Sequence, residues 1–369
     1  MEETLTYIES LTHHPLVMFN LMQGSQWQKN VEKLKSENPD RLYLPIIIYN
    51  DEYEAGNPLS SHAGTNKLSA VYATIPCLPP KYLSSLNAIF LCLLFKASDA
   101  KGVSHEHLFR VLIDELIFLQ ETGIEICTQT RTVRVCFIFS LLSGDNLELN
   151  DIGGYVMNFS RANHPCRICR VQMAVLHRQV VEEPNLLRNP DNYSQDLQTN
   201  DASVTGIREE CCFNRVPGFH ITTCCAGDVM HDIFEGVAGY NLVFLFNYLI
   251  DSKMISYELL CLKISDFDYG LIDSRNKPAN MHKNFNRESI KLSASEMITL
   301  VKYLPLILGD FVPPTDQVWE LFLIFKDIVD LLMAPEVQKG SSDLLKLLIR
   351  QHHELYLKLT KPTSSSNFI

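Results

Sequence analysis

The pattern of apolar positions divides the chain into a strand-rich first part and a helix-rich second part. Leu44–Tyr49 is a short β-branched run that ends at Asn50-Asp51, which predicts a buried strand. Lys67–Ile75 alternates between apolar and polar residues and predicts a second strand. Ala88–Phe95 is continuously apolar, so it fits a third buried strand or a short helix, which periodicity does not separate.

A helix and two more strands follow these three segments. Ser104 is a good N-cap, and leucines recur at helical spacing until Gly123, so the spacing predicts a helix over Ser104–Gln120. Glu125–Cys127 and Val133–Leu142 are typical of strands. The order strand, strand, strand, helix, strand indicates an α/β (α+β) fold with a mixed sheet.

The remaining segments suggest how the chain is organised. Residues 1–40 look helical and polar, with Trp27 and Leu34 as the expected buried positions, and Asp51–Gly64 has the composition of a loop. Val180–Thr205 is polar and Pro-containing, which favours a loop or a loosely packed insertion. We therefore expect five segments: an N-terminal helical segment (1–40), the first part of the core (41–175), a loop-rich insertion (176–215), a core helix with the residues before it (216–256), and a helical C-terminal region (257–369).

Composition and charge limit the classes of protein to consider. The 369 residues are 46% hydrophobic and 20% charged, which is typical of a globular protein with a substantial core. We expect neither a membrane span nor a signal peptide, because no apolar run reaches about 18 residues and the N-terminus lacks a basic and an apolar region. The net charge of −11 argues against nucleic-acid binding through bulk positive charge, but it leaves room for an enzyme that meets phosphates through metal ions.

Two aspartates follow predicted strands and could share metal ions. Asp51 follows the first strand and Asp145 follows the last. Mg²⁺ prefers carboxylate and phosphate oxygens, and a two-metal phosphoryl-transfer site needs carboxylates on rigid neighbouring strands. The pattern fits such a site if the two strands are adjacent. The alternative is that both aspartates are ordinary turn residues, because Asp commonly ends strands.

Cysteine and histidine are concentrated between residues 164 and 231. Eleven cysteines in a chain without a secretion signal favour reduced thiols or metal ligands over disulfides. Cys166 and Cys169 form a CxxC pair, whose tight turn aims two thiolates at one tetrahedral Zn²⁺. Buried free cysteines and a redox pair are the alternatives. Residues that could complete a zinc site are Cys211, Cys212, His220, Cys224, Cys225, Asp228 and His231.

The segment Asp228–Glu235 opens a predicted helix. Asp228 could cap this helix, and His231 and Glu235 lie four residues apart, so both face the same side. A metal-binding histidine and a catalytic glutamate could therefore serve neighbouring sites. The alternative is an ordinary polar pair on a solvated face.

Together these motifs resemble transposases of the CACTA (En/Spm-like) superfamily. The resemblance runs in order over about residues 44–250, and no single motif decides it. The residues that carry it are Asp51, Gly56-Asn-Pro-Leu59, His62-Ala-Gly64, Lys67-Leu68, Leu78-Pro-Pro80, Glu115-Leu116, Gly123-Ile124, Gly144-Asp145-Asn146, the Cys166/Cys169 pair and Asp228-Val-Met-His231.

The resemblance implies an RNase H-like fold with a DDE acid triad, and DNA strand cleavage and joining that uses Mg²⁺ or Mn²⁺. It implies Asp51 and Asp145 as the first two acids. Glu235 is our choice for the third acid, with Glu258 as the fallback. It also implies DNA (transposon ends) as the partner, a nuclear location and a homo-oligomer when active. The implied structural Zn²⁺ ties an insertion to the core, and we expect its ligands among Cys166, Cys169, His220, Asp228 and His231.

Two other functional classes remain open. The first is a non-enzymatic, zinc-stabilised DNA- or protein-binding protein derived from a transposable element. The second is a helical scaffold with buried cysteines. The chain is short for such a transposase, so we also expect an inactive fragment or a domesticated relative.

Overall fold

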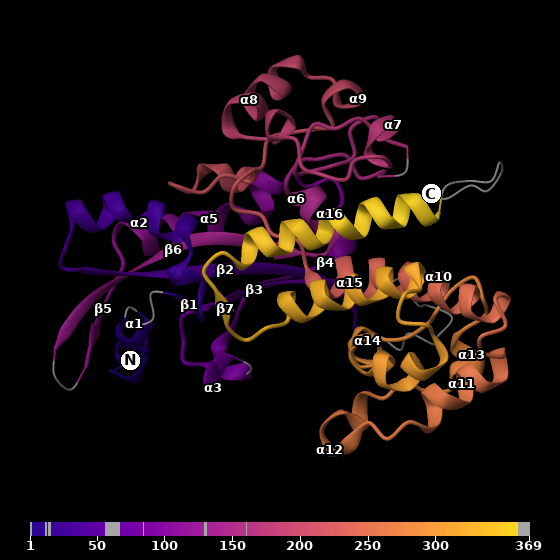
Figure 1. Cartoon of the computed structure of the whole chain (residues 1–369). Helices are drawn as coiled ribbons and strands as arrows, with labels where there is room; N and C mark the ends of the chain where they lie inside the picture. Colours follow the sequence, from indigo (N-terminus) through magenta and orange to yellow (C-terminus); the bar gives the residue numbers. More distant parts are fainter. Residues whose placement is uncertain are drawn as a thin grey trace. The chain divides into compact units, whose positions relative to one another are not determined.

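The computed structural model describes residues 2–11, 13, 16–55, 67–83, 85–128, 131–159 and 161–360. The chain forms two compact units: the first comprises residues 1–177 and 182–227, and the second comprises residues 178–181 and 228–369 (Figure 1). Gly56–Leu59 and His62–Gly64, which contribute to the transposase resemblance, lie outside the described residues.

A five-stranded mixed sheet is the centre of the first unit. The strand order is β4-β3-β2-β6-β5, in which β2 and β6 run parallel and the other neighbouring pairs run antiparallel. The strands are β1 (Val17–Met18), outside this sheet, and β2 (Arg41–Glu54), β3 (Lys67–Thr74), β4 (Ile89–Lys96), β5 (Ile124–Cys127) and β6 (Thr132–Gly144).

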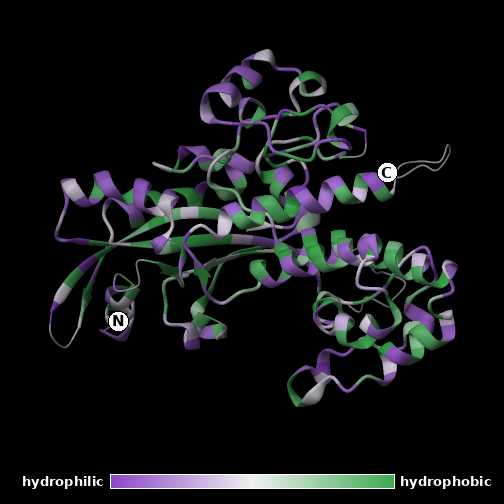
Figure 2. Cartoon of the chain, in the orientation of Figure 1, coloured by the Kyte–Doolittle hydropathy of each residue, from purple (hydrophilic) through white to green (hydrophobic). Residues whose placement is uncertain are grey.

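Helices make up most of the remaining regular structure of the first unit. They are α1 (Glu2–Leu11), η1 (Leu21–Gln23), α2 (Ser25–Glu37), α3 (Pro80–Leu83), η2 (Leu86–Ala88), α4 (Ala97–Ala100), α5 (His105–Glu121), α6 (Asn146–Ile152), α7 (Met173–Leu176), η3 (Pro184–Leu186), α8 (Pro190–Thr199), α9 (Ala202–Thr205) and η4 (Cys212–Arg215). Figure 2 shows hydrophobic colour along the central strands and mostly hydrophilic colour on α2.

The apolar residues of β2 and β6 form the core of the first unit with α2 and α5. Trp27 of α2 is buried there as expected, whereas Leu34 is half-buried. Helix α5 begins as predicted, because the His107 N–H donates to the Ser104 hydroxyl (3.4 Å). It ends before Gly123, which has φ +67° and leaves no room for a Cβ, since that atom would lie 2.4 Å from the Val135 carbonyl oxygen.

The structure corrects two sequence-based expectations and decides an open alternative. Residues 51–54 continue strand β2 instead of opening the loop, because they pair with Lys67–Ala70 of β3. The apolar run at 88–95, which fitted a buried strand or a short helix, is the strand β4, paired with β3, but this edge strand is half-buried to exposed and not buried. The 180–205 insertion is not loosely packed, since it carries α8 and α9 and buries Tyr193 and Asp196.

The second unit is helical apart from the short strand β7 (Val337–Gln338), as the apolar stripes predicted. Its core joins residues from α10, α11, α14 and α15. Its helices are η5 (Met230–Val237), α10 (Ala238–Asp251), α11 (Tyr257–Asp266), α12 (Gly270–Asp273), η6 (Ser274–Asn276), α13 (Met281–Asn284), α14 (Ala294–Leu308), η7 (Gly309–Phe311), α15 (Gln317–Leu332) and α16 (Ser341–Leu359).

Helices η5 and α10 form one continuous helix, Met230–Asp251, which has a mean hydropathy of 1.4 over its most apolar stretch. By length and composition this helix could cross a membrane, but a core helix of a globular unit passes the same test. Its buried side chains belong to the core of the second unit: Phe234, Ala238, Leu242, Leu245, Phe246 and Leu249.

Candidate active site

The two predicted aspartates belong to neighbouring strands: Asp51 lies within β2, and Asp145 directly follows β6. In the parallel ladder between β2 and β6, the last paired residues are Asn50 and Gly144, so Asp51 and Asp145 occupy the next positions of their segments. Gly144 allows this close approach, because a Cβ there would lie 3.1 Å from the Asn50 carbonyl oxygen. A shared acidic site required the strands that carry the two aspartates to be adjacent, and β2 and β6 are adjacent.

Asp145 is the N-cap of α6. Its Oδ1 accepts a hydrogen bond from the Glu148 backbone N–H (2.7 Å), which satisfies one of the unpaired donors at the start of the helix. This contact gives the carboxylate a fixed direction. Asp145 therefore has the local role of a helix cap, as the alternative interpretation suggested. Its second carboxylate oxygen could still bind a metal ion.

Asp51 lies within the extended part of β2, where it pairs with Ala70 of β3. Successive side chains of a strand point to opposite faces of the sheet. The Asp51 side chain therefore points to the face opposite that of Asn50 and Glu52. The strand backbones bring positions 51 and 145 together, and the convergence of their carboxylates stays a prediction.

A buried polar chain links β3, β2 and α6 beside these aspartates. The Ser69 hydroxyl donates to Asn50 Oδ1 (3.0 Å), and the Asn50 side-chain amide donates to Glu148 Oε2. Asn50 and Ser69 are only 3% and 2% exposed. Because buried polar groups need partners, this chain holds the Glu148 carboxyl in one position.

Glu148 carries the most perturbed carboxyl group of this region. Burial raises its pKa to about 7, and the negative charges of Glu52 and Asp145 add to that effect. The carboxyl is therefore partly protonated at neutral pH, and a cation placed beside it would favour the ionised form. Strongly perturbed carboxyls of this kind are frequent at functional sites.

A cleft of about 360 Å³ opens on the Asn50 and Glu52 face of the sheet. His105, the first residue of α5, lies 3.4 Å from the Asp151 carboxylate; this contact raises the pKa of His105 and lowers that of Asp151. The charged groups that line the cleft are Glu52, Lys101, His105, Glu148 and Asp151, beside an apolar wall that includes Phe95, Val103 and Leu108.

Sequence reasoning missed Asn50, Glu148 and Asp151 as members of this region. A signal was present, because Asp145, Glu148 and Asp151 are spaced three apart and so follow one face of a helix. The helix α6 was not predicted, so the spacing did not indicate that these three side chains share a face. Asn50 had no comparable signal, since its role depends on the register of β2 with β3 and β6.

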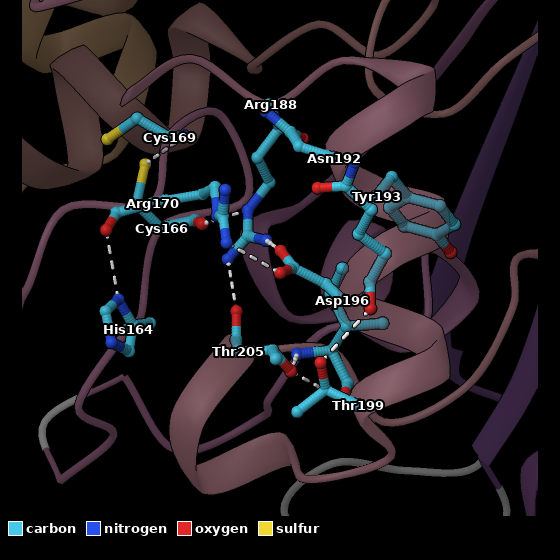
Figure 3. A network of polar contacts seen from close by, with 12 residues as sticks. His164, Cys166, Cys169, Arg170, Arg188, Asn192, Tyr193, Asp196, Thr199 and Thr205 are labelled. Atoms are coloured by element: carbon cyan, nitrogen blue, oxygen red, sulfur yellow. Dashed lines mark hydrogen bonds and ion pairs between the residues drawn. The ribbon is translucent and has the colours of Figure 1, made fainter. Parts of the chain in front are cut away.

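The CxxC pair forms a compact turn in the first unit. Cys166 Sγ accepts hydrogen bonds from the backbone N–H groups of Ile168 (3.3 Å) and Cys169 (3.4 Å). The Cys169 thiol also donates to Cys166 Sγ, which lowers the pKa of Cys166 to about 6 and raises that of Cys169. The two sulfur atoms therefore point toward each other, as metal binding by a CxxC pair requires (Figure 3).

The other candidate ligands of the first unit have different surroundings. Cys211, Cys212 and Cys224 are buried in its core, where burial raises the pKa of Cys211 and raises that of Cys212 to about 12. His220 Nδ1 is hydrogen-bonded to the Thr222 hydroxyl (2.7 Å), and its ring packs edge-on against that of Tyr193. Because Cys211, Cys212 and Cys224 are buried, they fit the buried-thiol alternative.

The Asp228–Glu235 segment belongs to the second unit. Asp228 Oδ1 accepts a hydrogen bond from the Met230 N–H (2.9 Å) at the start of the helix, as its predicted capping role requires. Its Oδ2 lies 2.8 Å from His231 Nδ1, and His231 Nε2 lies 4.0 Å from Glu235 Oε2. Asp228 thus orients the imidazole with Nε2 toward Glu235, as carboxylates orient metal-binding histidines. Glu258, the fallback acid, lies in the first turn of α11.

Among the residues that the structure describes, no three His, Cys, Asp or Glu side chains are gathered closely enough to hold a metal ion. The predicted acid triad and the complete zinc site therefore stay predictions.

No family model matches this sequence, and no curated protein matches it. The function of the chain must therefore be argued from its side chains and their geometry.

Proposed function

We propose that this chain is a DDE-type transposase, or a relative of one, which cleaves and joins DNA strands by metal-dependent phosphoryl transfer. The observation that carries the proposal is the parallel pairing of β2 with β6, which ends at Asn50 and Gly144, directly before Asp51 and Asp145. An RNase H-like core is part of this proposal. The order of three strands, a helix and a returning strand beside the first supports that core, with the short edge strand β5 as an addition.

The chemistry of the carboxylates fits Mg²⁺ or Mn²⁺. These ions take hard oxygen ligands, and the crowding of negative charge around Glu148 is a situation that a divalent cation would relieve. We propose Asp51 and Asp145 of the first unit as residues that would hold them, and the third acid, for which the family resemblance suggests Glu235, stays a prediction. When bound, such ions would lower the pKa of an attacking water and stabilise a leaving 3′ oxygen.

The residues of the chain would contribute position and orientation. Asp145 is directed by its hydrogen bond from the Glu148 N–H, and Glu148 is held by Asn50. Because β2 and β6 are inner strands of the sheet, the backbone that carries Asp51 and the residue before Asp145 is fixed by the core. Rigid placement of this kind is what phosphoryl transfer demands of a protein.

A structural Zn²⁺ is the second part of the proposal. The sulfur pair of Cys166 and Cys169 fits it, because sulfur is a preferred zinc donor and Cys166 is set to ionise near neutral pH. Within the first unit His220 is the proposed additional ligand, and Asp228 and His231 of the second unit stay predictions of the family resemblance. DNA ends as the substrate, a nuclear location and a homo-oligomeric active form come only from the family resemblance.

A second candidate is a zinc-stabilised binding protein that derives from such an element and has lost catalysis. The direction of Asp51, away from the face of Glu52, favours it. In that case Asp145 would act only as a helix cap.

Divalent-metal-dependent nicking of an oligonucleotide duplex tests the proposal. We expect the chain to nick DNA with Mn²⁺, and Asp145→Asn to abolish nicking with little change in melting temperature, because Asn caps helices as well as Asp does. Asp51→Asn should have the same effect on nicking. Comparing Glu235→Gln with Glu258→Gln would identify the third acid.

Alanine at position 145 is the matched control for the cap. Asp145→Ala should also abolish nicking, but it should lower stability by about 1 kcal/mol through loss of the cap. Metal-dependent nicking retained by Asp145→Asn would reject the assignment. A wild-type chain that binds DNA without nicking it would favour the second candidate.

A further inference from the structure

We propose that Arg188 is a positioning residue for the Cys166–Cys169 pair, and that it holds the two thiols together before a soft metal ion such as Zn²⁺ binds. This inference rests on the zinc part of the proposed function and needs no DNA cleavage. Arg188 lies in the 176–215 segment, which the sequence suggested was loosely packed.

The Arg188 guanidinium is completely buried and all three of its nitrogen atoms are engaged. Nε donates to the Cys166 carbonyl oxygen (3.1 Å), one terminal nitrogen to Asp196 Oδ2 (3.1 Å) and the other to the Thr205 carbonyl oxygen (2.8 Å). The group also lies over the ring of Tyr155, 5.5 Å from its centroid. One side chain therefore ties the CxxC turn to α8 and to the end of α9 (Figure 3).

The backbone reinforces the same connection. The Arg188 N–H donates to the Ile168 carbonyl (3.0 Å), and the Arg170 N–H donates to the Leu186 carbonyl (2.8 Å). Cys169 and Leu187 form the antiparallel bridge between these two bonds. Residues 168–170 and 186–188 thus form a short ladder along one side of the CxxC turn.

Asp196 fixes the orientation of Arg188. Its carboxylate is 3% exposed and accepts from Arg188 on one oxygen and from Arg170 on the other (2.9 Å). A buried ion pair of this kind is costly to desolvate and adds little net stability compared with apolar residues of the same size. Its retention here is explained by geometry, because only a fork with three directed donors reaches Cys166, Asp196 and Thr205 at once.

The consequence concerns metal affinity. The carbonyl bonded by Arg188 belongs to Cys166, whose sulfur accepts the N–H groups of Ile168 and Cys169. Without Arg188 the turn would lose one anchor, and zinc binding would have to supply the free energy that orders the thiols. Outer contacts that orient metal ligands typically contribute roughly 10–100-fold in affinity.

Zinc affinity of the full-length, metal-stripped chain, measured by competition with a chromophoric chelator, tests the inference. We expect Arg188→Lys to weaken zinc binding roughly 10–100-fold, since lysine keeps the charge but lacks the fork. Arg170→Lys is the matched control, because Arg170 contacts the same carboxylate from a half-exposed position, and its affinity should stay near that of the wild type. Cys166→Ser should lose the zinc.

A variant that keeps its fold guards against a simple folding defect. The double variant Arg188→Met with Asp196→Leu replaces the buried pair by apolar side chains, which proteins often tolerate without loss of stability. It should keep the melting temperature of the metal-free chain and still bind zinc more weakly. A purely structural role would change the melting temperature and leave the zinc affinity of the folded chain unchanged.

Two results would overturn the inference, and they are distinguishable. If the wild type binds zinc through Cys166 and both Arg188 variants bind it equally well, Arg188 does not position the pair. If the wild type binds no zinc, the zinc part of the proposed function fails with it. Nicking by the aspartates is measured separately, so its failure is distinguishable from either result.

Discussion

At the scale of single residues, Glu148 shows how a folded chain changes the chemistry of a carboxyl group. It is three residues from Asp145 in sequence, yet Glu52 of β2 contributes more to its electrostatic environment than Asp145 does. Burial and these like charges favour its neutral form. The hydrogen bond from Asn50 offsets only part of this effect, and it also directs the group toward the cleft.

This environment makes stability depend on pH. Glu148 has a pKa of about 7 in the folded chain, above the ordinary value of 4.5. The unfolded chain therefore releases this proton first, so stability falls as pH rises from 4.5 to about 7. We expect Glu148→Gln, which keeps the acceptor for Asn50, to raise the free energy of unfolding by about 3 kcal/mol at pH 8 and to change little at pH 4. Urea unfolding at both pH values measures this, and an equal effect at both would contradict it.

At the scale of elements, buried polar contacts fix where helices lie. In the second unit, His352 of α16 is buried and its Nε2 lies 2.7 Å from Asn241 Oδ1 of α10. The Asn241 amide nitrogen donates to the Val237 carbonyl, so Oδ1 is the acceptor and His352 Nε2 carries the proton. Burial lowers the pKa of His352 to about 4.

The attachment of α16 should therefore weaken in acid. The neutral imidazole stabilises the fold fully above pH 6.5, and this contribution is lost as pH falls toward 4. At pH 5 the loss is about 2 kcal/mol. We expect His352→Gln, which can still donate to Asn241, to remove most of this pH dependence, as measured by hydrogen exchange of α16 at pH 7 and pH 5. The exposed His107→Gln is the control and should leave it unchanged.

The CxxC turn is the element that connects the thiol site to the acidic site. Arg167, between the two cysteines, donates to Asn146 Oδ1 (2.6 Å), and Asn146 directly follows Asp145. The start of α6 is therefore held by the Asp145 cap and by the CxxC turn. This connection makes a stable CxxC turn relevant to the direction of Asp145.

At the scale of the whole molecule, charge limits how the chain can meet DNA. The net charge of −11 means that acidic side chains outnumber the Lys and Arg side chains that could displace counterions from the phosphate backbone. We expect weak, non-specific DNA binding by this chain alone, with a shallow salt dependence equivalent to about three phosphate contacts or fewer. Fluorescence anisotropy with a labelled duplex between 50 and 200 mM salt measures the slope. A slope equivalent to 6–10 contacts would contradict the expectation and indicate a basic surface that net charge conceals.

The sequence by itself determined the order of the main strands of the sheet and of the helix α5. Leu44–Tyr49, Lys67–Ile75 and Val133–Leu142 were recognisable as strands because β-branched runs and alternation reflect local burial. The helix after Ser104 was recognisable from its cap, its spacing and Gly123. These patterns depend on neighbouring residues only, so they can be recognised without knowledge of the fold.

Only the tertiary structure decided which residues meet. The register of β2 with β6 places Asp51 beside Asp145 along the strands, whereas the alternation of β2 turns Asn50 and Glu52 to the cleft. The insertion at 176–215 has no apolar pattern in its sequence. Its packing depends on the buried ion pair of Arg188 and Asp196, and charged residues in a sequence usually indicate an exposed surface. Pairings of this kind join residues distant in the chain, and their energy depends on burial that no local pattern records.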